Sequence, residues 1–211
     1  MKGNGYKLKI ILLAAGKSER FNGIKLLAKV QQQDDSITLI QHVLQQISKA
    51  LNILNIDESN LHVATGGYHP QLAQLIANQY SLSYCEDAHS GLGHTIAQSV
   101  EKTLKNEDNT SHIMITLADQ VALNSDDYVN LIKQSFATPD KLICAKVDQE
   151  IMPPAIFPYD YFTDLMTLKG DKGAKALLHV NKENLEQVLL PNAAVDIDTL
   201  EDLINWHKRD I

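Results

Sequence analysis

Apolar runs and apolar helical faces alternate along most of this chain. Short continuous apolar runs, typical of strands buried on both faces, predict strands at Leu8–Leu13, Leu61–Thr65, Leu82–Cys85, His112–Leu117 and Leu142–Val147. Apolar residues at helical spacing predict helices at Ser36–Leu51, at Pro70–Tyr80, from Gly91-Leu92-Gly93 onward, and at Ser125–Phe136. Strands that alternate with helices imply a doubly wound α/β fold, a mostly parallel sheet with helices on both faces.

The regular alternation ends after Val147. Pro153-Pro154 precedes a short apolar piece at Ala155–Phe157, and two short helices are predicted beyond it. An apolar strand at Gln187–Leu190 and a final helix at Thr199–His207 follow. The sequence contains no low-complexity linker and no internal repeat, so we expect one domain over residues 1–211.

Composition narrows the classes of function. The chain has 211 residues, 44% of them hydrophobic, and 19 basic against 26 acidic residues give a net charge of 19 − 26 = −7. An acidic chain without a basic run is a poor binder of nucleic acid, and no nucleic-acid partner is expected. The apolar run Ile10–Ala15 is too short for a signal peptide or a membrane helix, so we expect a cytoplasmic protein without a membrane partner. Cys85 ends one predicted strand and Cys144 lies in another, and both are expected to be buried free thiols.

Glycine and polar residues collect after the predicted strands. In open α/β sheets, ligands bind beyond the carboxyl ends of the strands. That rule selects Ala14–Lys25, Gly66-Gly67, Gly91–Gly93 and Asp119-Gln120 as candidate site segments.

The first of these segments contains Gly16-Lys17-Ser18, which is the ending of a phosphate-binding P-loop. A P-loop requires an earlier glycine at position 11, where this chain has Ile11 inside the first strand. The dinucleotide fingerprint G-x-G-x-x-G also fails, because no third glycine lies between Gly16 and Gly23. The segment is therefore neither of these two common phosphate-binding loops.

The same loop has properties that suit an anionic ligand. Small residues at Ala14, Ala15 and Gly16 let the backbone approach a ligand closely. Positive charge gathers in one short segment of an acidic protein, at Lys17, Arg20 and Lys25. The alternative is an ordinary surface turn with solvated charges.

The order of residues from Leu13 to Lys25 resembles the L-A-A-G-x-S-x-R-x-G-x-x-K signature of nucleotidyltransferases. More narrowly, it resembles the MobA-like molybdenum cofactor nucleotidyltransferases, although Asn22 lengthens the Arg20–Gly23 interval by one residue. Further segments resemble that family in the same order along the chain: Ser90–Ile96, Leu117–Gln120, Pro154–Phe157, Gly170–Leu178 and Asp196–Leu203. The sequence departs from the family pattern at Val121, Met152 and Leu200.

The resemblance implies a set of site residues. It makes Lys25, Arg20 and Asp119 the catalytic residues of a reaction in which a phosphate attacks a nucleoside triphosphate and pyrophosphate leaves. It places the nucleotide along Leu13, Ala14, Ala15, Gly16, Ser18, Gly91, Gly93 and Thr95. It divides the chain into a nucleotide-binding half, about 1–120, and an acceptor-binding half, about 121–211.

The resemblance also implies a Mg²⁺ cofactor held by Asp119 and Asp198. Alternatives remain for each acidic residue and for the lysine. Asp119 could cap a helix or turn. Asp198 could belong to the N-cap region of the last helix, with Asp196 or Thr199 sharing that role. Lys25 could be a solvated loop lysine.

The likeness to cytidylyltransferases favours CTP as the nucleotide, because that group tends to carry L-A-A-G where guanylyltransferases carry L-A-G-G. A methyl group at Ala15 would limit the room for a purine. The implied acceptor is the terminal phosphate of the molybdopterin (molybdenum) cofactor, with a recipient molybdoenzyme or its chaperone as a further partner.

Three alternatives stay open. The chain could be a guanylyltransferase that uses GTP on the same cofactor, or it could act on another phosphorylated acceptor. It could also be a non-catalytic chaperone that binds nucleotide or pterin, since the departures at Val121, Met152 and Leu200 are what drift away from catalysis would produce.

Overall fold

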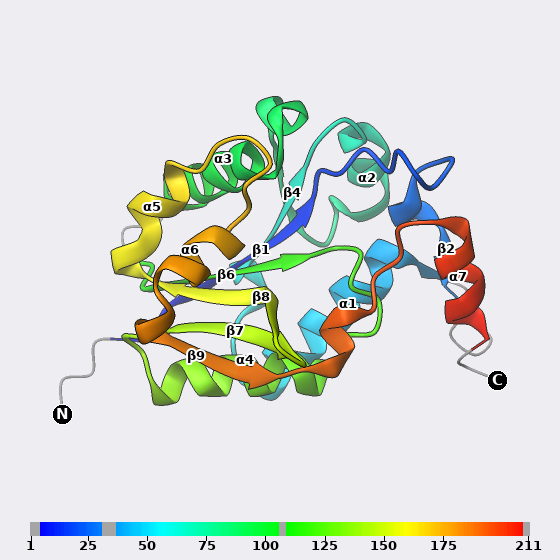
Figure 1. The fold of residues 1–211 in the computed structure, drawn as a ribbon. Coiled ribbons are helices and arrows are strands. Elements are labelled where there is room, and N and C mark those ends of the chain that lie inside the picture. Colours follow the sequence, from blue (N-terminus) through cyan, green and yellow to red (C-terminus); the bar gives the residue numbers. More distant parts are fainter. Residues whose placement is uncertain (1–4, 31–36, 106–108, 209–211) are drawn as a thin grey trace.

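The computed structural model describes residues 5–30, 37–105 and 109–208. A seven-stranded sheet in the order β5-β4-β1-β6-β8-β7-β9 forms the centre of the molecule (Figure 1). Its strands are β1 (Leu8–Ala14), β4 (Leu61–Thr65), β5 (Ser81–Tyr84), β6 (His112–Leu117), β7 (Leu142–Val147), β8 (Glu150–Pro158) and β9 (Leu185–Leu189). A separate antiparallel ribbon is formed by β2 (Lys29–Val30) and β3 (Ile37–Thr38).

Helices lie against both faces of this sheet (Figure 1). They are α1 (Leu39–Ile53), α2 (His69–Ile76), α3 (Leu92–Leu104), α4 (Ser125–Ala137), α5 (Phe162–Met166), α6 (Lys175–Val180) and α7 (Leu200–His207). Short 3₁₀ turns that matter for the site are η1 (Lys25–Leu27), η3 (Glu86–Ser90) and η6 (Pro191–Ala194).

The central strand β1 contributes to two hydrophobic cores, one on each face of the sheet. Ile10 and Leu12 pack in the core formed with α1 and α4, whereas Ile11 and Leu13 pack in the core formed with α3, α5 and α6. All seven residues of β1 are buried. A strand buried on both faces explains why its sequence is a continuous apolar run instead of an alternating one.

The structure confirms the doubly wound α/β class and most of the predicted elements. The strands at β4, β6 and β7 have the predicted bounds, and β1 extends one residue further, to Ala14. Helix α1 begins at Leu39 because Thr38 caps it in a capping box with Gln41. The predicted start of that helix, Ser36, lies outside the described residues.

Some predicted bounds are wrong. Helix α2 ends at Ile76, not at Tyr80. Cys85 follows β5 instead of ending it, and β9 runs Leu185–Leu189 instead of Gln187–Leu190. Both cysteines are buried and free, as predicted.

The largest correction concerns β8, of which the sequence predicted only Ala155–Phe157. The strand covers Glu150–Pro158 and runs antiparallel to both β6 and β7, so the sheet is mixed. The pairing register with β7 jumps from Cys144–Ala155 to Ala145–Met152, which leaves Pro153 and Pro154 unpaired in a bulge. Proline has no N–H to donate to a strand ladder, and a bulge accommodates it within a longer strand.

Among the described residues, no helix is both long enough and apolar enough to cross a membrane.

Candidate active site

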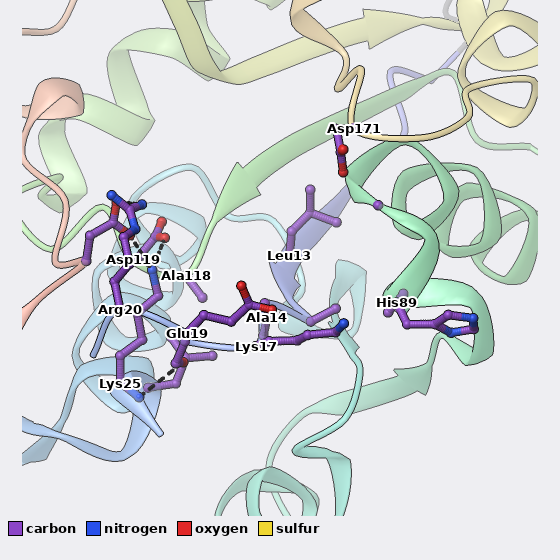
Figure 2. A pocket seen from close by; sticks show the side chains of 17 residues that line it. Leu13, Ala14, Lys17, Glu19, Arg20, Lys25, His89, Ala118, Asp119 and Asp171 are labelled. Carbon is purple, nitrogen blue, oxygen red and sulfur yellow. Dashed lines mark hydrogen bonds and ion pairs between the residues drawn. The ribbon is translucent and has the colours of Figure 1, made fainter. Parts of the chain in front are cut away.

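A cavity of about 520 Å³ opens at the carboxyl ends of β1 and β6 (Figure 2). Most residues that the sequence proposed for the site line it: Leu13, Ala14, Ala15, Gly16, Ser18, Arg20, Lys25, Gly91, Asp119 and Asp198. Two of the proposed residues, Gly93 and Thr95, are buried in α3 and are not part of the lining. The cavity therefore lies where ligands bind in open α/β sheets.

Lys25 lies at one end of this cavity between two aspartates. Its Nζ is 2.6 Å from Asp119 Oδ2 and 2.8 Å from Asp198 Oδ1, and its side chain is only 11% exposed. Burial lowers the pKa of Lys25, but the charges and hydrogen bonds of Asp119 and Asp198 raise it by more, and the net shift is upward. Lys25 is thus a fixed cation at neutral pH and not a solvated loop lysine.

The two aspartates come from distant parts of the chain that are joined through the backbone. Asp119 follows β6, and its carbonyl oxygen accepts a hydrogen bond from Ile197 N at 3.0 Å. Next to Asp119, the buried Gln120 donates through Nε2 to Pro153 O and to Ala193 O, both at 2.8 Å. These bonds fix the β6 end, the β8 bulge and the segment that carries Asp198 relative to one another.

Asp198 does not cap the last helix. Thr199 is the N-cap of α7 and forms a capping box with Asp202, whose Oδ2 also accepts from Asp198 N. The Asp198 carboxylate instead contacts Lys25, and its Oδ2 lies 2.5 Å from Arg20 Nη2. Partial burial raises the pKa of Asp198, but Lys25 and Arg20 lower it by more, so the group is ionised at neutral pH.

Asp119 does not cap a helix or turn with its side chain either. Its Oδ2 contacts Lys25, and its Oδ1 is buried without a hydrogen-bond partner in the described part of the chain. A buried carboxylate oxygen without a partner is costly unless a ligand or ion satisfies it.

The loop between β1 and η1 accommodates Asn22 in a left-handed turn. Phe21 is 5% exposed and packs into the core, while Arg20 projects outward with a side chain that is 72% exposed. Ser18 and Asn22 both take φ of +55°, a left-handed conformation that asparagine tolerates better than most residues. Ser18 Oγ then accepts from Lys25 N at 3.3 Å, which closes the loop over Phe21.

The glycines at the start of α3 meet the loop at 169–173. A Cβ on Gly91 would lie 2.5 Å from Gly170 C and O, and a Cβ on Gly93 would lie 2.8 Å from Lys169 N and Lys172 O. Gly93 N donates to Gly170 O at 2.7 Å. Thr95 is buried and its Oγ1 donates to Gly91 O at 3.3 Å. Gly93 and Thr95 thus support neighbouring residues of the cavity wall without lining the cavity themselves. Their proposed contact with the nucleotide stays a prediction.

Some lining residues were not singled out from the sequence. Ala88 and His89 reach the cavity from η3, and Asp171 reaches it from the loop that contacts α3. Asp171 belongs to a segment, Gly170–Leu178, that resembles the family, but Asp171 itself was not named as a site residue.

A model of the MobA-like NTP transferase domain matches residues 10–188. The chain belongs to this family. The curated Purine catabolism protein PucB of Bacillus subtilis (strain 168) is 28% identical over 195 residues, which cover 90% of each chain. This match and the family model agree with the order of motifs along the sequence.

Solved structures share the fold of this MobA-like chain. Rv0371c from Mycobacterium tuberculosis H37Rv has a TM-score of 0.78 at 20% identity, over 99% of this chain and 100% of that one. Its complex with manganese has a TM-score of 0.75 at 18% identity, over 97% and 99%. A CMP:2-keto-3-deoxy-manno-octonic acid synthetase complexed with CTP has a TM-score of 0.67 at 15% identity, over 97% and 100%.

The acidic end of the MobA-like site fits a divalent cation. Asp119 and Asp198 both contact Lys25 Nζ, and Asp119 Oδ1 has no partner in the part of the chain that the structure describes. Within the same residues, no cluster of three or more His, Cys, Asp or Glu side chains has the geometry of a metal site. Magnesium is commonly held by one or two carboxylates together with substrate phosphates and waters, which is what this pair offers.

Proposed function

We propose that this chain transfers a cytidylyl group from CTP to the terminal phosphate of the molybdopterin (molybdenum) cofactor, with release of pyrophosphate and with Mg²⁺ as cofactor. The observation that carries this proposal is the position of Lys25, held between Asp119 and Asp198 at one end of the cavity. A buried cation beside two carboxylates suits a reaction between two anions that also requires a metal ion.

The chemistry requires positioned charge more than a strong base. A phosphate monoester is already anionic near neutral pH, so its oxygen can attack the α-phosphorus without prior deprotonation. Two anionic molecules must meet, and charge accumulates on the leaving pyrophosphate. Arg20 and Lys25 supply fixed positive charge for these phosphates, and the backbone of Ala15–Ser18 offers N–H groups beside them.

Asp119 and Asp198 would hold the magnesium ion. Neutralisation of phosphate charge is what such an ion would supply there. Because Lys25 donates hydrogen bonds to both carboxylates, it orients them toward the same point. Arg20 restrains Asp198 from the other side.

The wall near Ala15 supports a pyrimidine as the base. A Cβ on Gly66 would lie 2.7 Å from Ala15 O and 3.1 Å from Ala15 Cβ, so Ala15 rests directly on the backbone that follows β4. Its methyl group therefore has little freedom to withdraw from a larger base. The CTP complex of the synthetase with the same fold supports cytidine nucleotides as ligands of this architecture.

The acceptor assignment rests on the family resemblance and needs its own experiment. Purified protein is incubated with CTP, magnesium and the molybdenum cofactor, and the products are analysed by mass spectrometry. A cytidine dinucleotide form of the cofactor is expected. Transfer of labelled cytidylyl to a sugar or alcohol phosphate, with none to the molybdenum cofactor, would assign the chain to another acceptor.

The same incubation also tests the chaperone alternative. Tight binding of cofactor and nucleotide with no covalent product would make this chain a carrier. Asp119 and Lys25 are both retained and in contact, which favours the enzyme.

A further inference from the structure

The cavity has two ends of different chemistry. Arg20, Lys25 and Asp119 lie together at one end, and Asp171 and His89 lie at the other, with Leu13 and Ala14 between them (Figure 2). The charged end would hold phosphates, as proposed above. With the phosphates at the charged end, the nucleoside would extend toward Asp171 and His89.

Asp171 differs from Asp119 and Asp198, the two aspartates at the charged end of the cavity. Asp119 and Asp198 are neutralised by Lys25 and Arg20, whereas the Asp171 side chain makes no hydrogen bond or ion pair within the described residues. A carboxylate without a cationic partner repels phosphate, so its place in an anion-binding cavity suits contact with a hydrogen-bond donor of the ligand.

The position of Asp171 is fixed by its loop. Gly93 N donates to Gly170 O at 2.7 Å, and Gly170 N donates to His94 Nδ1 at 3.0 Å. A Cβ on Gly91 would lie 2.6 Å from Asp171 Oδ1, so the carboxylate rests against bare backbone at the cavity wall. Gly170, just before Asp171, takes φ of +61°, a left-handed conformation that glycine adopts readily.

We infer that Asp171 is a specificity-determining residue that accepts a hydrogen bond from the exocyclic amino group of the nucleobase and thereby selects CTP over UTP. Cytosine has an amino group where uracil has a carbonyl oxygen. The carboxylate accepts from the first and repels the second, so one residue supplies both attraction and rejection. This inference rests on the proposed function for the orientation of the nucleotide, but it does not depend on the acceptor.

The test measures CTP and UTP affinities by titration calorimetry in the presence of magnesium, without any acceptor. Variants Asp171→Asn and Asp171→Ala are compared with the wild type. Asp160→Asn is the matched control, because Asp160 is an exposed aspartate that does not line the cavity. A hydrogen bond to a charged group is worth enough that its loss weakens binding by roughly tenfold or more.

We expect the wild type and Asp160→Asn to prefer CTP strongly. In Asp171→Asn and Asp171→Ala, CTP binding weakens by roughly tenfold or more while UTP binding is unchanged or improves. The ratio of CTP affinity to UTP affinity therefore falls toward 1:1. An equal loss for both nucleotides would show that Asp171 acts on a part that CTP and UTP share, and unchanged affinities for both would show that Asp171 contacts neither nucleotide. Either result overturns this inference and leaves the proposed use of CTP standing. A wild type that binds neither nucleotide, or both equally, overturns the inference together with the proposed use of CTP.

Discussion

Lys25 Nζ lies 2.6 Å from Asp119 Oδ2, across 94 positions of sequence. This contact joins the loop after β1 to the end of β6, and the second contact of Lys25, with Asp198, brings in the segment before α7. One buried lysine thus links the cation-rich loop to both candidate metal ligands. The first predictions test this arrangement.

Replacement of Lys25 should abolish most of the activity. Removal of one fixed charge that faces transition-state charge costs about 10²–10³ in kcat. We expect Lys25→Ala to lose about that much in pyrophosphate release, measured under saturating nucleotide. Lys17→Ala is the matched control, since Lys17 is an exposed lysine of the same loop, and it should lose much less. Similar losses in the two variants would contradict a special role for Lys25.

Asp119 should determine metal affinity. Its Oδ1 is buried and has no protein partner in the described residues, and Asp119→Asn removes the charge that would hold a cation there. We expect manganese, used as a probe and followed by electron paramagnetic resonance, to bind at least about tenfold more weakly, or ~1.4 kcal/mol. Glu19→Gln neutralises another acidic residue of the cavity lining and should leave manganese binding unchanged. An equally large loss of manganese affinity in Glu19→Gln would indicate that the ion is attracted by the general negative charge of the cavity and is not held at Asp119.

The Lys25 cluster should stabilise the fold over a wide pH range. The pKa of Asp198 is lowered, so its contribution is present above the ordinary aspartate value, about 4, and is lost as pH falls through its folded pKa. The pKa of Lys25 is raised, so its contribution is full below about 10.4 and is lost as pH rises through its folded pKa.

The corresponding measurement is the thermal unfolding midpoint of wild type minus that of Lys25→Met, taken from about pH 3 to 11. We expect a constant difference in the middle of this range and a smaller one at each end. A difference that grows toward acid pH would have the wrong sign for these pKa shifts.

Gly93 should be required for the position of the 169–173 loop. A methyl group there would meet Lys169 N and Lys172 O at 2.8 Å, and both are backbone atoms that cannot rotate away. We expect Gly93→Ala to lower the free energy of unfolding by about 1–3 kcal/mol in urea titrations and to weaken CTP binding. Gly67→Ala is the control, because its Cβ would meet nothing within 4 Å.

Ala15 should influence the choice of base. Its methyl group is held against Gly66, so only its removal, not its displacement, makes room for a purine. We expect Ala15→Gly to raise the ratio of GTP to CTP turnover. An unchanged ratio would indicate that the base does not contact Ala15.

The sequence predicted those parts of the fold that depend on local pattern. Continuous apolar runs identified β1, β4, β6 and β7 because strands buried on both faces need no alternation. Strand β8 was not predicted in full, because Pro153-Pro154 is a strand-breaking signal and its bulge depends on pairing with β7.

The residues of the candidate site were likewise predictable only where a local motif identifies them. Arg20, Lys25, Asp119 and Asp198 were identified from motif order, and the structure brings them into contact. The sequence left the N-cap of α7 open among Asp196, Asp198 and Thr199, because neighbouring side chains can all accept the same hydrogen bonds. The position of Asp171 was not predicted, because it depends on contact between Gly93 and Gly170. No local pattern in one sequence records such contacts.

The most direct test of the proposed function is a pyrophosphate-release assay across all four ribonucleoside triphosphates, with magnesium, with and without the molybdenum cofactor. We predict rapid release only when CTP, magnesium and the cofactor are all present. Equal release from GTP would contradict the assignment of the base, and no release from any nucleotide with the cofactor present would contradict the proposed transfer itself.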